Sequence, residues 1–280
     1  IAILVGFLWV FPEVHTFDLL KYTKPINYNY YYGFIAIYGL CMHSIFPERS
    51  RLLLLLIVSS LFLVLLWQVR AVWVSVVAAM AFLSVFKYRE LFSILMKRKY
   101  VVIAILIVSF WFGYAHKEQH VETLGKEFIS IFDHDMNYKS SATIRWRLAL
   151  WKQAINKGLK TNPVLGTGFG SDYGFMIGGK PLVEEKGLGV RSGIIPPHNI
   201  HITLFYKMGL AGQVTYCVIQ ISFLILGLRF LLRTKDPFDK HVVLASVASV
   251  IHFNIAAMFF EGIETPQVAV LLWANMGIAM

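Results

Sequence analysis

Long apolar runs separated by short polar stretches cover most of this 280-residue sequence. Because a helix needs about 20 apolar residues to cross a bilayer, runs near that length predict membrane spans. The run 200–232 is longer than one span needs, so its first half is expected along the membrane interface or inside the protein. The pattern predicts an all-α transmembrane bundle built from eight runs, several of them short: 1–11, 30–46, 52–69, 71–86, 100–115, 200–232, 241–260 and 267–280.

The composition excludes an ordinary soluble domain. Hydrophobic residues make up 57% of the chain and charged residues only 15%, with a mean hydropathy of +0.62. The net charge of +10 could attract nucleic acid, but the excess basic residues lie mostly at the ends of apolar runs, where they report topology. We therefore expect no nucleic-acid partner. Cys41 and Cys217 both lie within apolar runs, so no structural disulfide is predicted. Since the sequence begins at Ile1 inside an apolar run, we expect a piece of a longer protein.

The basic residues of the short loops indicate which side of the membrane each loop occupies. If every run crosses once, one side receives Arg49, Arg51, Lys87, Arg89, Lys97, Arg98, Lys99, Arg229, Arg233, Lys235 and Lys240. The positive-inside rule assigns that side to the cytoplasm. The long stretch 116–197 then lies on the extracytoplasmic side. The chain divides into about five amino-terminal spans (1–115), this large loop (116–197) and about three carboxy-terminal spans (198–280).

The large loop is too small for an ordinary independent domain, so we expect it to pack on the membrane helices. After the possible capping residues Ser140, Ser141 and Thr143, apolar residues recur at helical spacing until Asn162 and Pro163 end the pattern. Beyond this predicted helix, glycines between 166 and 179 give a backbone that can approach a ligand closely or form a mobile lid. Pro196 and Pro197 then force extended backbone before a new helix that starts at His198.

Three arginines are candidates for binding an anion. Arg70 follows an apolar run, has no neighbouring acid, and lies on the side opposite to the basic clusters. It is either a snorkelling residue at the membrane edge or a ligand of an anion such as phosphate, since guanidinium offers phosphate oxygens a planar fork of donors. Arg145 and Arg147 either bind an anion too or form the solvated face of the predicted helix. Arg147 shares a face with Trp151, four residues later.

His198, Asn199 and His201 cluster at the start of the next predicted helix. A helix amino end disfavours the protonated imidazole, so a neutral histidine there can act as a general base. The alternative is a purely structural role. Weaker candidates are a cation site at Asp133 and Asp135 and a zinc pair at His116 and His120, whose spacings are poor matches, and we predict no metal site and no cofactor. His43 and His252 lie in spans and could serve a transporter, but no span carries a series of ionisable residues.

Taken in chain order, these features resemble the O-antigen ligase and O-antigen polymerase family over roughly residues 66–232. The resemblance includes Arg70, the segment 140–151 and the segment 162–168. It is most specific at His198 and Asn199, which are followed by nine residues and then by the paired glycines of 209–212. Gln213 and Val214 depart from the family, because ligases often have Thr after the second glycine. This departure leaves ligase against polymerase open.

The resemblance implies a glycosyltransferase C-like helical bundle with a mainly helical periplasmic loop, in the bacterial inner membrane. Its reaction would transfer a glycan from undecaprenyl pyrophosphate to a lipid A-core hydroxyl at the periplasmic face, without metal and with inversion. Arg70 and Arg147 would bind the pyrophosphate, and His198 would orient or deprotonate the acceptor hydroxyl. The supporting substrate-binding residues would be Arg145, Asn199, Trp151 and His201. The alternatives are O-antigen polymerase, protein O-oligosaccharyltransferase and, more distantly, a transporter or flippase.

Overall fold

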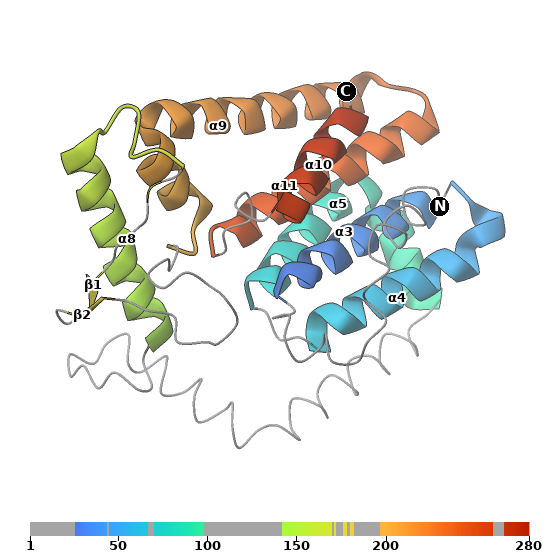
Figure 1. Ribbon diagram of the computed structural model, residues 1–280. Helices are drawn as coiled ribbons and strands as arrows, with labels where there is room; N and C mark the ends of the chain where they lie inside the picture. The colour runs from blue at the N-terminus through green and yellow to red at the C-terminus, as the bar shows by residue number, and fades with distance from the viewer. Residues whose placement is uncertain are drawn as a thin grey trace, which may run out of the picture.

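The computed structural model describes residues 26–43, 45–66, 70–97, 142–169, 171, 176–177, 180–181, 197–259 and 266–279. Within these ranges the fold is helical except for one pair of two-residue antiparallel strands. The elements, shown in Figure 1, are α3 (Ile26–His43), η2 (Pro47–Arg49), α4 (Ser50–Leu66), α5 (Arg70–Lys97), α8 (Ala142–Thr161), β1 (Met176–Ile177), β2 (Lys180–Pro181), α9 (Ile200–Arg233), α10 (Pro237–Ala257) and α11 (Pro266–Ile278).

Six of the eight apolar runs form helices, while the runs 1–11 and 100–115 lie outside the described residues. Among the described helices, α9 and α10 are long and apolar enough to cross a membrane, and α4, the first part of α5, and α11 are shorter apolar helices. α5 continues beyond the end predicted for its run, up to Lys97. Its helical backbone is interrupted at Lys87 (φ −131°, ψ 23°), so the predicted end of the span coincides with a kink.

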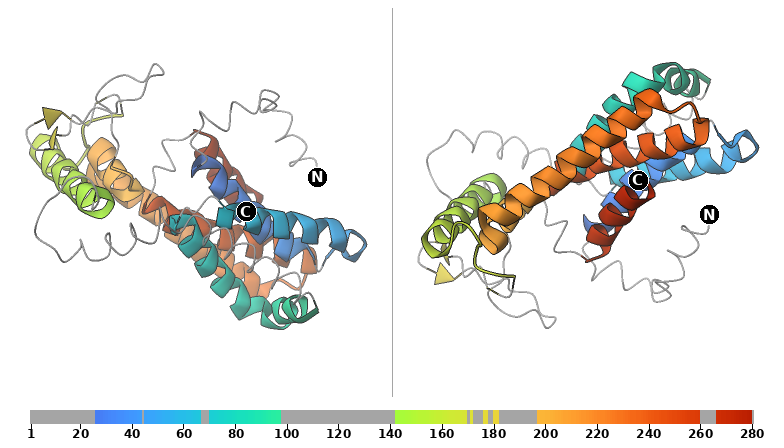
Figure 2. Two further views of the ribbon diagram at one scale, coloured as in Figure 1. Left: turned by 90° about the horizontal axis from the view of Figure 1, so that it is seen from below. Right: turned by 90° about the horizontal axis from the view of Figure 1, so that it is seen from above.

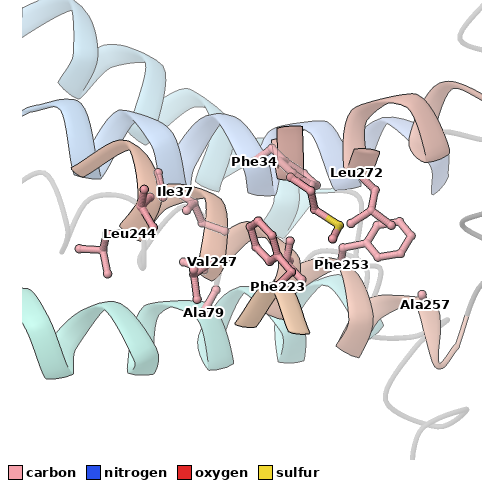
Figure 3. Close-up of a cluster of buried hydrophobic side chains, with 14 of the residues drawn as sticks. Phe34, Ile37, Ala79, Phe223, Leu244, Val247, Phe253, Ala257 and Leu272 are labelled. Carbon is pink, nitrogen blue, oxygen red and sulfur yellow. The ribbon is translucent and has the colours of Figure 1, made fainter. Parts of the chain in front are cut away.

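The core surrounds α10, whose side chains pack against α3, α5, α9 and α11. Figure 3 shows Phe34 of α3, Ala79 of α5, Phe223 of α9 and Leu272 of α11 around Val247 and its neighbours, all nearly inaccessible to solvent. Glycines let the helices approach closely. A methyl group at Gly227 would lie 2.5 Å from Val247 Cγ2, and one at Gly33 would overlap the His252 ring. Close approach through small residues is how helices associate in a bilayer.

Contacts along α3 and α10 show that the two helices run antiparallel. The hydroxyl of Tyr30, near the start of α3, donates to the carbonyl of Ala256 (3.4 Å), and the hydroxyl of Tyr38 bonds to Ser246 Oγ (2.8 Å). Tyr38 also bonds to Asn275 of α11. These buried polar contacts fix the register between helices that are otherwise apolar.

The corner between α3 and α4 lies beside the corner between α9 and α10, because the rings of Phe46 and Phe238 are 6.5 Å apart, edge to face. We call this part of the bundle the basic end, because Arg49, Arg51, Lys235 and Lys240 lie there. At the other end of α10, the Asn199 side chain binds the carbonyl of Met258 at 2.9 Å. We call this the site end. An α-helix of 21 residues separates the two ends by about 30 Å.

α9 is not one straight helix, because its backbone breaks at Gly209 (φ 65°, ψ −164°). The short segment 200–208 runs beside α8 and across the direction of the long segment that follows (Figure 1). Both views in Figure 2 place α8 beyond one end of the helical bundle, next to the start of α9. The 24 residues from Leu210 to Arg233 still span about 36 Å, which is enough to cross a bilayer.

Candidate functional site at the start of α9

The break in α9 is filled by the loop that follows α8. The amide groups of Leu210 and Ala211, which have no helical partner after the break, donate to the carbonyls of Pro163 (2.8 Å) and Val164 (3.0 Å). In the opposite direction, the amides of Thr167 and Gly168 donate to the carbonyls of Tyr206 (2.9 Å) and Lys207 (2.8 Å). The break leaves these four backbone groups of α9 without helical partners, and the loop supplies a hydrogen bond to each of them. Buried backbone groups require such partners.

Two glycines make this backbone contact possible. Gly166 (φ 75°) and Gly209 (φ 65°) both adopt positive φ angles, and a methyl group on Gly166 would lie 2.5 Å from the Gly209 nitrogen. A methyl group on Gly209 would overlap the Val164 carbonyl. The sequence predicted that these glycines let the backbone approach a ligand closely. In the structure, the glycines up to residue 168 instead let the loop approach the backbone of α9. The later part of the glycine-rich stretch, with the predicted lid, lies largely outside the described residues.

Asn199 is the N-cap of α9 and ties it to α10. Its side-chain oxygen accepts from the amides of His201 (2.9 Å) and Ile202 (3.2 Å), while its side-chain nitrogen donates to the Met258 carbonyl (2.9 Å). Such a cap typically stabilises a helix by about 1 kcal/mol. Only 8% of Asn199 is exposed. These contacts give it a positioning function at the site end, and its predicted contact with substrate stays a prediction.

Trp151 fixes the chain on the other side of His198. Its indole Nε1 donates to the carbonyl of Pro197 at 2.6 Å. Further along, Gly158 of α8 packs against the ring of Phe205, so α8 and the first segment of α9 run parallel. Arg147 lies one turn before Trp151 on the same face of α8, and its side chain is half-buried. The structure therefore brings Arg147, Trp151 and the residues preceding α9 into one region.

His198 lies between these two fixed points in an uncommon backbone conformation. It is half-buried and has φ 51°, the one positive φ of a non-glycine residue among the described residues. Such a conformation costs an L-residue about 1–2 kcal/mol and is often found at functional sites. The predicted helix start is two residues too early, since α9 begins at Ile200. His198 therefore precedes the helix cap.

His201 contacts a residue that the sequence pattern did not indicate. Its Nδ1 is 2.8 Å from Nε2 of Gln213, and its ring packs edge to face against Tyr216 at 6.0 Å. In a straight helix, residues 12 positions apart lie about 18 Å apart and cannot bond. The break at Gly209 brings the two side chains together. Periodicity alone could not predict this pair, although the paired glycines marked the place where the helix is interrupted.

The two remaining arginines are placed only by their backbones. Arg70 is the first residue of α5, which starts beside the end of α4, because Trp73 Nε1 donates to the Val64 carbonyl at 2.8 Å. α4 begins at the basic end, so Arg70 lies toward the site end. Arg145 lies in the first turn of α8. The side chains of Arg70 and Arg145 lie outside the described residues, so their predicted contacts with phosphate stay predictions.

The comparison with protein families decides the identity. A sequence model of the O-antigen ligase family matches residues 52–217, more than half of the 280 residues. The chain belongs to the O-antigen ligase family. The matched region contains α4, α5, α8, the loop that fills the break, and α9 as far as Tyr216 and Cys217. No curated protein and no solved structure matches the chain.

Membership of the O-antigen ligase family confirms the resemblance found in the sequence and the general class of activity, which is glycan transfer of the O-antigen ligase or polymerase type. Together with the apolar helices α9 and α10, it also makes this a membrane protein. The described residues contain no group of three or more His, Cys, Asp or Glu side chains that could hold a metal ion. Asp133, Asp135, His116 and His120 lie outside them.

Proposed function

We propose that the protein transfers a glycan from undecaprenyl pyrophosphate to a sugar hydroxyl of the lipid A core at the periplasmic face of the bacterial inner membrane. The observation that carries this proposal is the position of His198. It lies inside the region matched by the O-antigen ligase family, and it is held between two elements by the Trp151–Pro197 and Asn199–Met258 hydrogen bonds. A candidate base held in this way at the membrane surface suits a reaction between two lipid-linked substrates.

The charge distribution supports a periplasmic reaction. The basic end carries Arg49, Arg51, Lys235 and Lys240, which the positive-inside rule assigns to the cytoplasm. The site end lies at the opposite end of α10, about 30 Å away, which matches the thickness of the hydrocarbon core. We therefore assign the site end, the large loop and α8 to the periplasmic side of a polytopic bundle.

Two arginines would bind the pyrophosphate of the donor. Arg147 lies on the face of α8 that packs at the start of α9, and Arg70 begins α5 toward the same end of the bundle. A guanidinium group can donate two parallel hydrogen bonds to phosphate oxygens and always carries its charge. Two such groups would offset the charge that develops on the leaving pyrophosphate, so no metal ion is required in this mechanism.

His198 would act on the acceptor hydroxyl. As the hydroxyl oxygen attacks the anomeric carbon, its proton passes to the imidazole, and the bond between that carbon and the pyrophosphate oxygen breaks with its electrons on the leaving group. In-line attack inverts the anomeric configuration without a covalent enzyme intermediate. Arg145 would support phosphate binding, and Trp151, Asn199 and His201 would hold the reacting groups in place.

The lipopolysaccharide of a deletion strain tests the function. We expect a core without O-antigen, together with accumulated polymer on undecaprenyl pyrophosphate, and restoration by the wild-type gene. A core that carries a single repeat would instead identify an O-antigen polymerase, the alternative left open by Gln213 in the position where ligases often have Thr. An unaltered lipopolysaccharide with glycan missing from a protein would identify a protein O-oligosaccharyltransferase.

Residue replacements test the assigned roles in the same strain. His198→Ala should abolish the lipopolysaccharide ladder at normal expression, since the acceptor hydroxyl loses its base. Arg70→Ala and Arg147→Ala should weaken binding of the lipid-linked donor. An undiminished ladder in His198→Ala excludes the histidine as base, and normal donor binding in either arginine variant rejects that assignment. Lys152→Ala, an exposed basic residue on α8, is the matched control.

A further inference from the structure

His201 offers one hydrogen-bond donor or acceptor that the described part of the chain does not use. Its Nδ1 is bonded to the side-chain nitrogen of Gln213, and its side chain is half-buried at the start of α9. Within the described part of the chain, Nε2 has no hydrogen-bond partner. Asn199 places the ring by capping the turn from which it projects. His201 therefore lies three residues after His198, in the first turn of α9, with its Nε2 not used by the described residues.

Gln213 determines what Nε2 can do. An amide nitrogen only donates hydrogen bonds, so Nδ1 of His201 accepts and the proton of the neutral imidazole lies on Nε2. The same amide nitrogen lies 3.3 Å from Cys217 Sγ, a weak acceptor, while the buried Gln213 Oε1 has no hydrogen-bond partner among the described residues. With Nδ1 occupied by Gln213, the Nε2–H of His201 remains as a hydrogen-bond donor.

The support for this pair extends to α10. The Tyr216 ring, which packs against His201, has its hydroxyl bonded to Asn254 Oδ1 at 2.8 Å. Asn254 in turn donates to Gln220 Oε1 at 3.0 Å. These contacts hold the start of the long segment of α9 against α10, so Gln213 is carried on a rigid element. Supporting hydrogen bonds of this kind are what keep a reactive side chain in one orientation.

We propose that Gln213 is a positioning residue that fixes His201 as an Nε2–H donor to a substrate oxygen. In this proposal His198 remains the base, and His201 has the distinct task of donating a hydrogen bond. The proposal rests on the function proposed above. The oxygen belongs either to the acceptor sugar or to the donor pyrophosphate. Separate KM values for the two substrates distinguish these, because only the substrate that His201 contacts should bind less well when the donor is lost.

Nitrogen-15 NMR of histidine-labelled protein in nanodiscs tests the tautomer without any need for activity. The signals of His201 are assigned by their loss in His201→Gln, which is necessary because the chain has 9 histidines. We expect Nε2 to carry the proton in the wild type. In Gln213→Glu the carboxylate accepts, so the proton should move to Nδ1. A wild-type Nδ1–H tautomer, or His201 signals that do not respond to Gln213→Glu, would overturn the proposal.

Transfer assays separate positioning from a merely structural role. Gln213→Leu should lower kcat by about ten-fold or more, because a misplaced donor is costly in a reacting complex. Gln213→Glu keeps a hydrogen bond to His201 and similar packing, so it should restore stability but leave kcat low. If Gln213→Glu restores kcat as well, the residue is structural and the proposal fails. Cys217→Ser, which alters the other neighbour of Gln213, should retain wild-type kcat. If the wild type transfers no glycan, the proposed function fails. The NMR experiment still tests whether Gln213 fixes the tautomer of His201, because it does not depend on activity.

Discussion

His198, the proposed base, has a backbone conformation that a residue with a side chain does not favour. Its φ of 51° falls in the left-handed region, which achiral glycine adopts freely and L-residues do not. The hydrogen bonds on either side, from Trp151 and Asn199, hold the chain in this conformation. A residue selected only for stability at this position would be glycine, so a histidine here is consistent with a functional requirement.

This strain gives a prediction at the residue scale. His198→Gly should be more stable than His198→Ala by about 1 kcal/mol, because alanine keeps the cost of the positive φ and glycine does not. Neither variant should transfer glycan. Thermal melting of the purified variants in one detergent measures the difference. Equal melting temperatures would mean that His198 does not hold a positive φ in the protein.

At the scale of elements, α8, its following loop and the broken α9 form one interlocked unit. The loop amides and carbonyls replace the helical partners lost at Gly209, and the two glycines with positive φ touch backbone to backbone. The nine-residue spacing from Asn199 to the paired glycines thereby fixes the length of the first segment of α9. It also fixes the distance from His198 to the break.

Three glycines provide a matched test of this interlock. Gly168 has φ 87° with nothing within 4 Å of its added methyl group, so Gly168→Ala should lose only about 1–2 kcal/mol from backbone strain. Gly166→Ala and Gly209→Ala add a backbone collision to the same strain and should lose at least about 2 kcal/mol more. Chemical or thermal unfolding measures all three. Similar losses for the three variants would show that the loop does not fill the break.

The elements also show what the sequence could and could not predict. Hydrophobic length predicted most of the described helices, because burying backbone polar groups in a bilayer leaves few alternatives to a helix. The helical period predicted α8 but not its buried face. The helical spacing that predicts this helix includes Leu148 and Leu159, yet each is 53% exposed, whereas Leu150 and Ala154 are fully buried. Contacts such as Gln213–His201 depend on a loop 40 residues earlier in the chain, and local pattern contains no information on them.

The packing of whole helices gives a third prediction. A methyl group at Gly33 of α3 would overlap the His252 ring of α10, so Gly33→Ala should destabilise the protein by about 1–3 kcal/mol. His252→Ala removes the obstacle, and the double variant should be less damaged than the sum of the two single changes. Melting temperatures of the wild type, the two single variants and the double variant form a double-mutant cycle that measures this coupling. Gly277→Ala, where nothing lies within 4 Å, is the control. Strictly additive losses would contradict the contact.

At the scale of the whole molecule, the proposed topology places the two ends of the bundle on opposite sides of the membrane. The rings of Phe46 and Phe238 bring two basic corners together at one end, while the candidate site occupies the other. The exposed side chains Asn156 of α8 and Lys240 of α10 therefore belong to opposite sides of the membrane under the proposed topology.

Cysteine labelling tests this arrangement in intact cells. With the two native cysteines replaced, a membrane-impermeant maleimide added to cells with a permeabilised outer membrane should label Asn156→Cys and not Lys240→Cys. Disruption of the inner membrane should then expose Lys240→Cys. Labelling in the reverse order would place the candidate site in the cytoplasm and contradict the proposed function.

The filled break in α9 also has a consequence for biosynthesis. The residues that supply the loop leave the ribosome about 40 residues before those that form the break, and under the proposed topology they have already been translocated when α9 enters the membrane. With that topology, the helix would meet its partners as it emerges, and its amide groups would not be left unsatisfied. Vectorial synthesis would then deliver the parts of this site in the order in which they fit together.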